Sequence, residues 1–545
     1  MIRRDLLKAS VGLGVSALAS SCCCTTPAVY ETDWRDGGHQ DPFPNEPNSF
    51  LKPKSPGEQL ITPSRIIDPH CHIYNASDWQ IGGALYGPLA HSVESSLTRM
   101  LLQVIAYPLE EIVSCLSITA EKELEQVEYL SWIPKNLIED ELKARVSEHR
   151  RIIEDALFDL FRQRRAAGII RQILAQDQTA FTGRIHTEFS REFLSDALDF
   201  SAMDIAPLGP GFDCKDPGLG AGLFGFLSQL CSPRWDNLKA YQAGFSPGNE
   251  FDIKGCYASL LDFDYWIGRS PHPPSTLRAQ MLLMEKISTL SEGYMKPMIA
   301  YNPWKDIKED DASIDLVVDA VCNHGFVGAK IYLQMGYYPL DNASQPAPAG
   351  DLPRPSDLGL LDKKLKRFWA TCRELDIPVM THSKNSMGRN RDHNKLGNPD
   401  AWERFFRDPT NAGTRVNLAH MGGETGSDSR HDNWTRRFTE IMNLPGATGL
   451  YGDFGMWKLL TEGCMTSQSR IRDLLKQPVS NKQTVADRFM FGTDWLMLIG
   501  KGAWNGYAQQ FLKMLEGRVE EEDLDKIFYK NAEKLFTRDI WGQFT

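Results

Sequence analysis

Eight short apolar runs are the feature that most constrains the fold of this chain of 545 residues. Stretches of helical periodicity separate them, such as "LGLLDKKLKRFWATCRELD" before the fifth run. Near-continuous apolar strands that alternate with helices are typical of a parallel sheet, and eight such units predict a closed (β/α)₈ barrel, an α/β fold of the TIM type. The runs lie near Ile66, Ile205, Ile299, Ile331, Val379, Leu418, Tyr451 and Phe491.

The spacing of these runs is uneven. A long segment of mostly helical pattern separates the first run from the second, and another precedes the third. We interpret residues from about 80 to 195 and from about 209 to 292 as large helical insertions after strands 1 and 2. Because insertions on such loops lie where the active site of a barrel is built, we expect them to form a helical cap over the barrel mouth.

Residues 1–24 have the pattern of a targeting segment. Arg3 and Arg4 precede an apolar stretch that is shorter than the roughly 20 residues of a membrane-spanning helix, which predicts a twin-arginine export signal. The residues before Cys22 resemble a lipoprotein cleavage site, so Cys22 is the expected acylation site. We therefore expect a protein that is periplasmic or lipid-anchored at the bacterial envelope. Residues 25–63, rich in Pro, Asp and Asn, predict a flexible tether, and residues 64–545 the barrel.

Charge narrows the choice of partner. The formal net charge is −11, and binding to nucleic acid needs a cationic surface that neutralises phosphates. We therefore expect a small-molecule substrate and no nucleic acid. We expect contact with the membrane only through the lipid anchor at Cys22.

Polar residues close several of the apolar runs. Histidines follow the first, fifth and sixth runs, and an aspartate follows the eighth. A single histidine at such a place is more often a packing residue, but these side chains would all face the same barrel mouth. Neutral imidazoles and a carboxylate suit Zn²⁺ or a similar divalent ion, so the set favours a metal site. The residues are Asp68, His70, His72, His382, His420 and Asp494.

With the motifs "DPHCH", "THS", "LAHMGG", "FGTDW" and "KNAEKLF", the chain resembles the amidohydrolase superfamily. It is most similar to the amidohydrolase-related (amidohydrolase 2) branch, which includes aminocarboxymuconate-semialdehyde-type decarboxylases and several hydrolases. The likeness covers about residues 65–536 without the two insertions. It implies that His70, His72, His382 and Asp494 hold one divalent ion, for which we expect Zn²⁺. It also implies that His420 hydrogen-bonds the reacting water or the substrate.

This arrangement suits hydrolysis. A divalent ion lowers the pKa of a water that it holds toward ~7, Asp494 can accept the proton of that water, and His420 can polarise the electrophile. Our leading hypothesis is an exported metal-dependent hydrolase of an amide, lactone or ester-like bond in a small anionic substrate, with Asp494 and His420 as catalytic residues. A non-oxidative decarboxylase, which is a lyase, would use the same ligand set. An exported binding protein without catalytic activity is the third hypothesis.

Lys330, in "GAKIY" at the fourth run, adds an alternative. In some members of the superfamily a carboxylated lysine at this strand bridges two metal ions, so the resemblance offers Lys330 as a bridging ligand. A purely structural lysine is the interpretation that we favour.

Five further residues are candidates for binding substrate. Lys384, Arg389 and Arg391 lie together after the fifth run, where they would bind a carboxylate or phosphate if they face the mouth. A solvated loop is the competing interpretation. Tyr332 and Trp304 would line an apolar pocket, and packing against the cap is the alternative for both.

Overall fold

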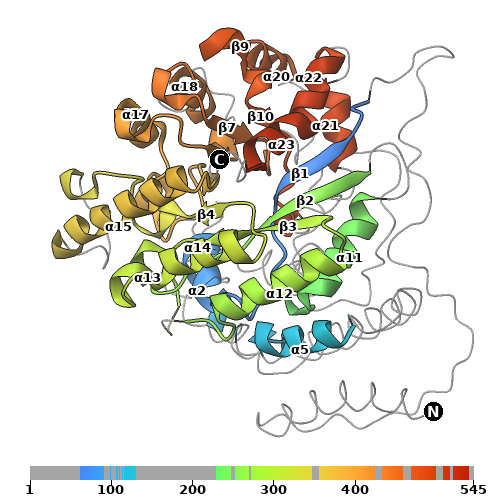
Figure 1. Cartoon of the computed structure of the whole chain (residues 1–545), viewed down its shortest axis with the longest axis vertical. Coiled ribbons are helices and arrows are strands. Elements are labelled where there is room, and N and C mark those ends of the chain that lie inside the picture. The colour runs from blue at the N-terminus through green and yellow to red at the C-terminus, as the bar shows by residue number, and fades with distance from the viewer. Residues whose placement is uncertain are drawn as a thin grey trace, which may run out of the picture. The chain divides into compact units, whose positions relative to one another are not determined.

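A computed structural model of the chain is shown in Figure 1. It describes residues 62–90, parts of 99–130, 229–246, 252–345 without 269 and 271, 355–423, 433–457, 468–498, 507–515 and 519–538. All of them belong to one of two compact units of the chain, Glu46–Thr545. Within these ranges no helix is both long and apolar enough to cross a membrane.

Eight strands form one sheet in which every neighbouring pair is parallel. Their order in the sheet follows their order in the chain, as in a (β/α)₈ barrel. The strands are β1 (Ile66–Cys71), β2 (Ile253–Ser259), β3 (Met295–Ala300), β4 (Ala329–Ile331), β5 (Val379–His382), β6 (Val416–Ala419), β7 (Leu450–Asp453) and β10 (Phe489–Met490). A separate antiparallel pair is formed by β8 (Pro478–Val479) and β9 (Gln483–Thr484).

The segment that follows β10 closes the sheet onto β1. Cys71 and Trp495 form a parallel bridge, and the His72 N–H donates to the Trp495 carbonyl at 2.6 Å. The Asp494 N–H donates to the His70 carbonyl at 2.7 Å. The closing contacts therefore involve three residues of the expected metal site, so the last strand and the first are joined where the site is built.

Helices lie around the strands (Figure 1), and α12 (Leu277–Leu290) shows how the sequence specifies one. Thr276 caps its first turn by accepting a hydrogen bond from the Ala279 N–H at 3.2 Å. Met281, Met284 and Ile287 recur at helical spacing and are fully buried. The α-helices that the structure describes after β3 are α13 (Pro303–Lys308), α14 (Ala312–Asn323), α15 (Pro355–Glu374), α16 (Arg391–Asn394), α17 (Pro399–Arg407), α18 (Trp434–Ile441), α20 (Gln468–Leu475), α21 (Tyr507–Leu515), α22 (Glu521–Asp525) and α23 (Asn531–Phe536).

The second strand is not where the sequence predicts it. The run near Ile205 lies outside the described residues, and the strand that pairs with both β1 and β3 is Ile253–Ser259. The predicted insertion at 209–292 therefore contains a barrel strand, and α12 after it occupies the position of a barrel helix. The prediction was wrong because "IKGCYAS" carries a lysine and a glycine, which interrupt the apolar run that a buried parallel strand usually shows.

The described part of the segment between β1 and β2 is helical and fixed by buried charges. It comprises α2 (Ile81–Ala84), a π-helical turn at Leu85–Leu89, α5 (Ala120–Leu130) and α11 (Arg234–Phe245). The fully buried Arg234 forms ion pairs with Asp78 and, at 2.7 Å, with Glu123. These contacts join α11 and α5 to the loop after β1. That this segment caps the barrel mouth stays a prediction.

Candidate metal centre

The expected site residues lie at the carboxyl ends of their strands. His70 is in β1, and His72 follows this strand directly. His382 ends β5, His420 follows β6 and Asp494 follows β10. All five side chains are buried, with relative exposures of 0 to 7%. The topology thus brings together residues that are more than 400 positions apart in the chain.

Backbone conformation aims two of these side chains. His420 and Asp494 both adopt left-handed conformations, with φ of 67° and 54°. Such angles are uncommon outside glycine and cost of order 1–3 kcal/mol each, so they persist only where the surroundings fix them. The two residues that the sequence assigns to catalysis therefore both lie in strained backbone at the ends of their strands.

Asp494 is the centre of the cluster. Its Oδ1 lies 3.4 Å from His70 Nε2 and 3.4 Å from His72 Nε2, and its Oδ2 lies 4.0 Å from His420 Nε2. His70, His72 and Asp494 each offer a ligand atom, and these atoms lie within 4.8 Å of one another. Two imidazoles and one carboxylate at this spacing are a donor set suited to a divalent transition metal such as Zn²⁺.

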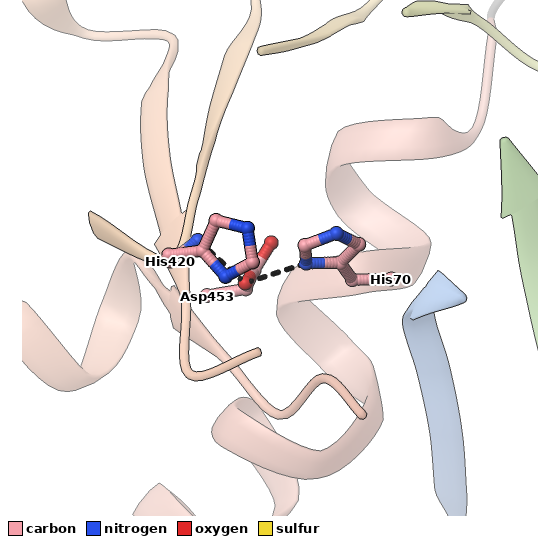
Figure 2. Close-up of side chains that lie close together, drawn as sticks. All are labelled: His70, His420 and Asp453. Carbon is pink, nitrogen blue, oxygen red and sulfur yellow. Dashed lines mark hydrogen bonds and ion pairs between the residues drawn. The ribbon is translucent and has the colours of Figure 1, made fainter. Parts of the chain in front are cut away.

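Partners on the far side of each ring determine which imidazole nitrogen carries the proton. His72 Nδ1 donates to the Ser259 carbonyl at 3.0 Å, and His420 Nδ1 donates to the Gly455 carbonyl at 2.6 Å. His70 Nδ1 faces Asp453 Oδ1 at 3.0 Å (Figure 2). Because carbonyl and carboxylate oxygens only accept, the proton must lie on Nδ1 in each ring, and the Nε2 lone pair faces the cluster. His70 Nε2 is buried and has no hydrogen-bond partner among the residues that the structure describes, which fits a position that a cation would fill.

His382 lies beside the cluster. Its Nδ1 is 3.1 Å from His420 Nε2, and its Nε2 is 3.3 Å from Ser386 Oγ. His382 does not join His70, His72 and Asp494 in one group of mutually close ligand atoms within the described part of the chain. Its role as a fourth ligand stays a prediction.

Burial keeps three of the imidazoles neutral. It lowers the pKa of His72 and of His382, and it lowers the pKa of His420 to about 3. Burial alone would raise the pKa of Asp494, but the charge of His70 and the hydrogen bond to His72 hold it below its usual value. Burial acts to lower the pKa of His70 as well, but the charges of Asp453 and Asp494 raise it above its usual value. Neutral imidazoles and an ionised carboxylate are the protonation states that metal binding requires.

Lys330 in β4 is also buried, with a relative exposure of 2%. Burial lowers its pKa to about 8, while the charges of Asp494 and Asp453 act in the opposite direction. Its amine makes no hydrogen bond or ion pair with another residue that the structure describes. The bridging role stays a prediction.

Of the candidate substrate-binding residues, Tyr332 and Lys384 have contacts at or near the cluster, and the other three do not show such contacts among the described residues. The ring of Tyr332 lies 5.0 Å from the ring of His382, so Tyr332 is at the cluster. Lys384 donates to the Met456 carbonyl at 3.1 Å, next to the Gly455 that holds His420. Trp304 is buried and donates its indole N–H to the Met335 carbonyl at 3.1 Å, which is a packing arrangement. The Arg389 side chain is exposed, and Arg391 begins the short helix α16.

Sequence reasoning missed one buried carboxylate, Asp453, and gave no separate role to a second, Asp68. Asp453 ends β7 and contacts both His70 and the backbone N–H of His420 (Figure 2). Asp68 lies within β1, accepts from Tyr241 at 2.7 Å and from Thr493, and burial raises its pKa to about 6. The rule that found the histidines, a polar residue that closes an apolar run, also applies to Asp453 in "GLYGD".

Comparison with known families agrees with this arrangement of fold and site. The fold and the site together define a class of protein, a barrel with histidines and a carboxylate at the carboxyl ends of its strands. Residues 295–538 match the family described as amidohydrolase, the amidohydrolase 2 branch. This match covers somewhat less than half of the chain and confirms the resemblance of its motifs to the amidohydrolase superfamily. No match was found among curated proteins.

Solved structures with a similar fold are distant in sequence. One is a probable 2-pyrone-4,6-dicarboxylic acid hydrolase from Acinetobacter baumannii with citric acid bound (11% identity, 55% of this chain and 88% of that chain, TM-score 0.35). Another is a 2,6-dihydroxybenzoate decarboxylase from Rhizobium (18%, 48% and 76%, TM-score 0.28). A third is an amidohydrolase from Burkholderia multivorans with bound zinc (11%, 52% and 83%, TM-score 0.32). With TM-scores this low, they carry no argument about the activity of this chain.

Proposed function

We propose that the chain is a metal-dependent hydrolase that cleaves an amide, lactone or ester-like bond in a small anionic substrate. The observation that carries the proposal is the convergence of two Nε2 atoms, from His70 and His72, on the carboxylate of Asp494. Each of these rings has its proton on the opposite nitrogen. The lone pairs of both Nε2 atoms thus face the centre of the cluster, and the side chains of the cluster are buried.

The residues present fit a zinc ion. Imidazole nitrogens and a carboxylate oxygen are its usual ligands, and the unpartnered Nε2 of His70 is a buried acceptor in need of a positive charge. When bound, such an ion would polarise a carbonyl oxygen of the substrate and acidify water. The resemblance adds His382 to the ligands.

Asp494 would then carry out the proton transfer, and His420 would hydrogen-bond the reacting water or the substrate. Asp494 is ionised, so it can accept a proton from water and pass it to the leaving group, and its Oδ2 lies 4.0 Å from His420 Nε2. His420 is neutral, with its Nδ1–H held by Gly455, so its orientation is fixed before substrate binds. Lys384, on the loop after β5, is a candidate for holding an anionic group of the substrate.

The test measures metal-dependent turnover and follows two products at once, the acid released by hydrolysis and the CO₂ released by decarboxylation. The full chain, stripped with a chelator and reconstituted with Zn²⁺, is offered small carboxylate-bearing lactones, esters and amides together with aromatic and unsaturated acids. We expect acid release that needs the metal, without release of CO₂, and loss of this activity in Asp494→Asn.

Two other results would replace this proposal. Release of CO₂ from an acid, again dependent on metal and on Asp494, would identify a decarboxylase, which the same superfamily contains. Saturable binding without turnover of any compound would favour a binding protein.

We also propose that the protein is exported by the twin-arginine route and remains periplasmic or attached through a lipid at Cys22. The support is the sequence of residues 1–24, which lie outside the described residues. Folding before export would allow the protein to acquire its metal in the cytoplasm.

A further inference from the structure

One carboxylate outside the predicted ligand set contacts the imidazole of His70 and the backbone of His420. Asp453 lies at the end of β7, is fully buried, and takes no part in the mechanism above. Its Oδ1 accepts from His70 Nδ1 at 3.0 Å and from the His420 backbone N–H at 3.0 Å. Both contacts are drawn in Figure 2.

The same oxygen also fixes the group that holds the ring of His420. Asp453 Oδ1 accepts from the Gly455 N–H at 2.9 Å, and the Gly455 carbonyl accepts from His420 Nδ1 at 2.6 Å. His420 is thus held at two places, its backbone directly and its ring through Gly455. A Cβ at position 455 would lie 2.5 Å from His70 Nδ1, so only glycine fits between Asp453 and His70.

The second oxygen of Asp453 is occupied as well. Asn417, on β6, donates its side-chain N–H to Asp453 Oδ2 at 2.8 Å. With three donors on Oδ1 and one on Oδ2, the carboxylate is saturated by protein groups. Although Asp453, His70 and His420 are close enough to be considered a metal-binding group, these contacts leave the carboxylate little capacity to bind an ion itself.

We propose that Asp453 is a positioning residue that fixes the tautomer of His70 and the orientation of His420, so that both present Nε2 to the metal and substrate. The inference rests on the proposed function, since it concerns the same site. Outer carboxylates on metal-binding histidines typically contribute a factor of about 10–100 in metal affinity or activity. We expect Asp453 to act within this range without contacting the ion.

Asp453→Asn is the first variant, because it keeps the shape and removes the charge. Its amide cannot satisfy all four donors: in either orientation an NH₂ group faces a donor of His70, His420, Gly455 or Asn417. We expect Zn²⁺ affinity, measured by competition with a chelator, to fall about 10–100-fold. In the metal-free protein we expect ¹⁵N shifts of the histidine rings to show that His70 no longer holds its proton only on Nδ1.

The exchange variant Asp453→Asn/Asn417→Asp is the rescue. The amide oxygen at 453 can accept from the three donors that face Oδ1, and the amide N–H can donate to the new carboxylate at 417. Every donor in the network then has an acceptor again. We expect it to regain most of the lost affinity and the original His70 tautomer. Asp306→Asn is the matched control, because Asp306 is equally buried but accepts from the Ser313 and Ile314 N–H groups, away from the site. It should lose stability without changing metal affinity.

Three results would overturn the positioning role. The first is unchanged affinity and tautomer in Asp453→Asn. The second is complete loss of metal without recovery in the exchange variant, which would identify Asp453 as a ligand. The third is an altered His70 tautomer in an exchange variant that folds. This result would still test the positioning role of Asp453 if the single variant Asp453→Asn does not fold. A wild-type chain that binds no metal would refute the proposed function, while the tautomers of the metal-free protein would still test Asp453.

Discussion

At the level of single residues, the site is a set of imidazoles whose neighbours hold each ring in one tautomer. His70, His72 and His420 each donate Nδ1–H to a buried oxygen, from Asp453, Ser259 and Gly455. A histidine with an unperturbed pKa near 6.5 would be partly protonated at neutral pH and would then repel a cation. Burial avoids this by lowering the pKa of His72 and His420.

Lys330 gives the first prediction. Its pKa in the folded protein is about 8, below the usual 10.5, so between these values the unfolded chain binds the extra proton and the free energy of unfolding rises with pH. At pH 7 both states are protonated, and the full cost of about 3 kcal/mol applies. We expect Lys330→Met to raise the free energy of unfolding of the metal-free protein at pH 7 by up to that amount. The rise between pH 8 and pH 10.5 in urea titrations should disappear.

Lys305→Met is the matched control for Lys330. Lys305 is also buried, but its amine forms ion pairs with Asp262 at 3.1 Å and Asp264 at 2.6 Å. Its removal leaves buried carboxylates unpaired, so this variant should be destabilised at pH 7. If Lys330→Met is destabilised too, or loses one of two metal ions, the amine has a partner or ligand role and the structural interpretation is wrong.

The residues of the site were predictable in part. His70, His72, His382, His420 and Asp494 are recognisable because each closes an apolar run and the barrel places all such ends together. Asp453 obeys the same rule but was missed, because a single acid at a strand end is common and only its neighbours show what it binds. The packing role of Trp304 depends on the Met335 carbonyl, which no sequence pattern indicates.

At the scale of elements, seven of the eight strands lie where apolar runs predict them. The exception, β2, contains Lys254 and Gly255, and Lys254 is exposed at the start of the strand. A polar residue is tolerated there because the strand only becomes buried on both faces from Gly255 onward. Without knowledge of its neighbours, such a strand is not distinguishable from a loop within a long insertion.

The segment between β1 and β2 gives a prediction at this scale. Arg234 is fully buried and joins α11 to Asp78 and to Glu123 in α5. Arg234→Ala would leave two buried carboxylates unpaired, so we expect the free energy of unfolding to fall by about 3–5 kcal/mol. Urea titration followed by circular dichroism measures this change.

Arg407→Ala is the control for Arg234, because the Arg407 side chain is 62% exposed and pairs with Glu403 on the surface of α17. It should cost less than about 1 kcal/mol. Equal effects of the two substitutions would show that Arg234 does not anchor the segment.

In the molecule as a whole, the site is assembled from both ends of the barrel sequence, and we propose that the protein is exported with this site already folded. Asp494 near the end of the barrel sequence reaches His70 and His72 near its beginning only after the sheet has closed. A protein that is transported folded can carry such a site, with its metal, out of the cytoplasm.

Export itself is testable by fractionation of cells. We expect the double substitution Arg3→Lys/Arg4→Lys to retain the protein in the cytoplasm, because the twin-arginine pair is read as an address. Lys8→Arg should leave export unchanged. Cys22→Ala should be exported but no longer associate with membranes, and normal export of the double variant would exclude this route.

The most direct measurement of the central claim is X-ray absorption at the zinc edge of the purified full chain, with metal content determined on the same sample. We expect one ion per chain, with imidazole nitrogens and a carboxylate oxygen at about 2.0–2.2 Å. His72→Ala should lower the number of imidazole ligands or the metal content. A chain without metal, or an ion whose spectrum contains no imidazole contribution, would contradict this expectation.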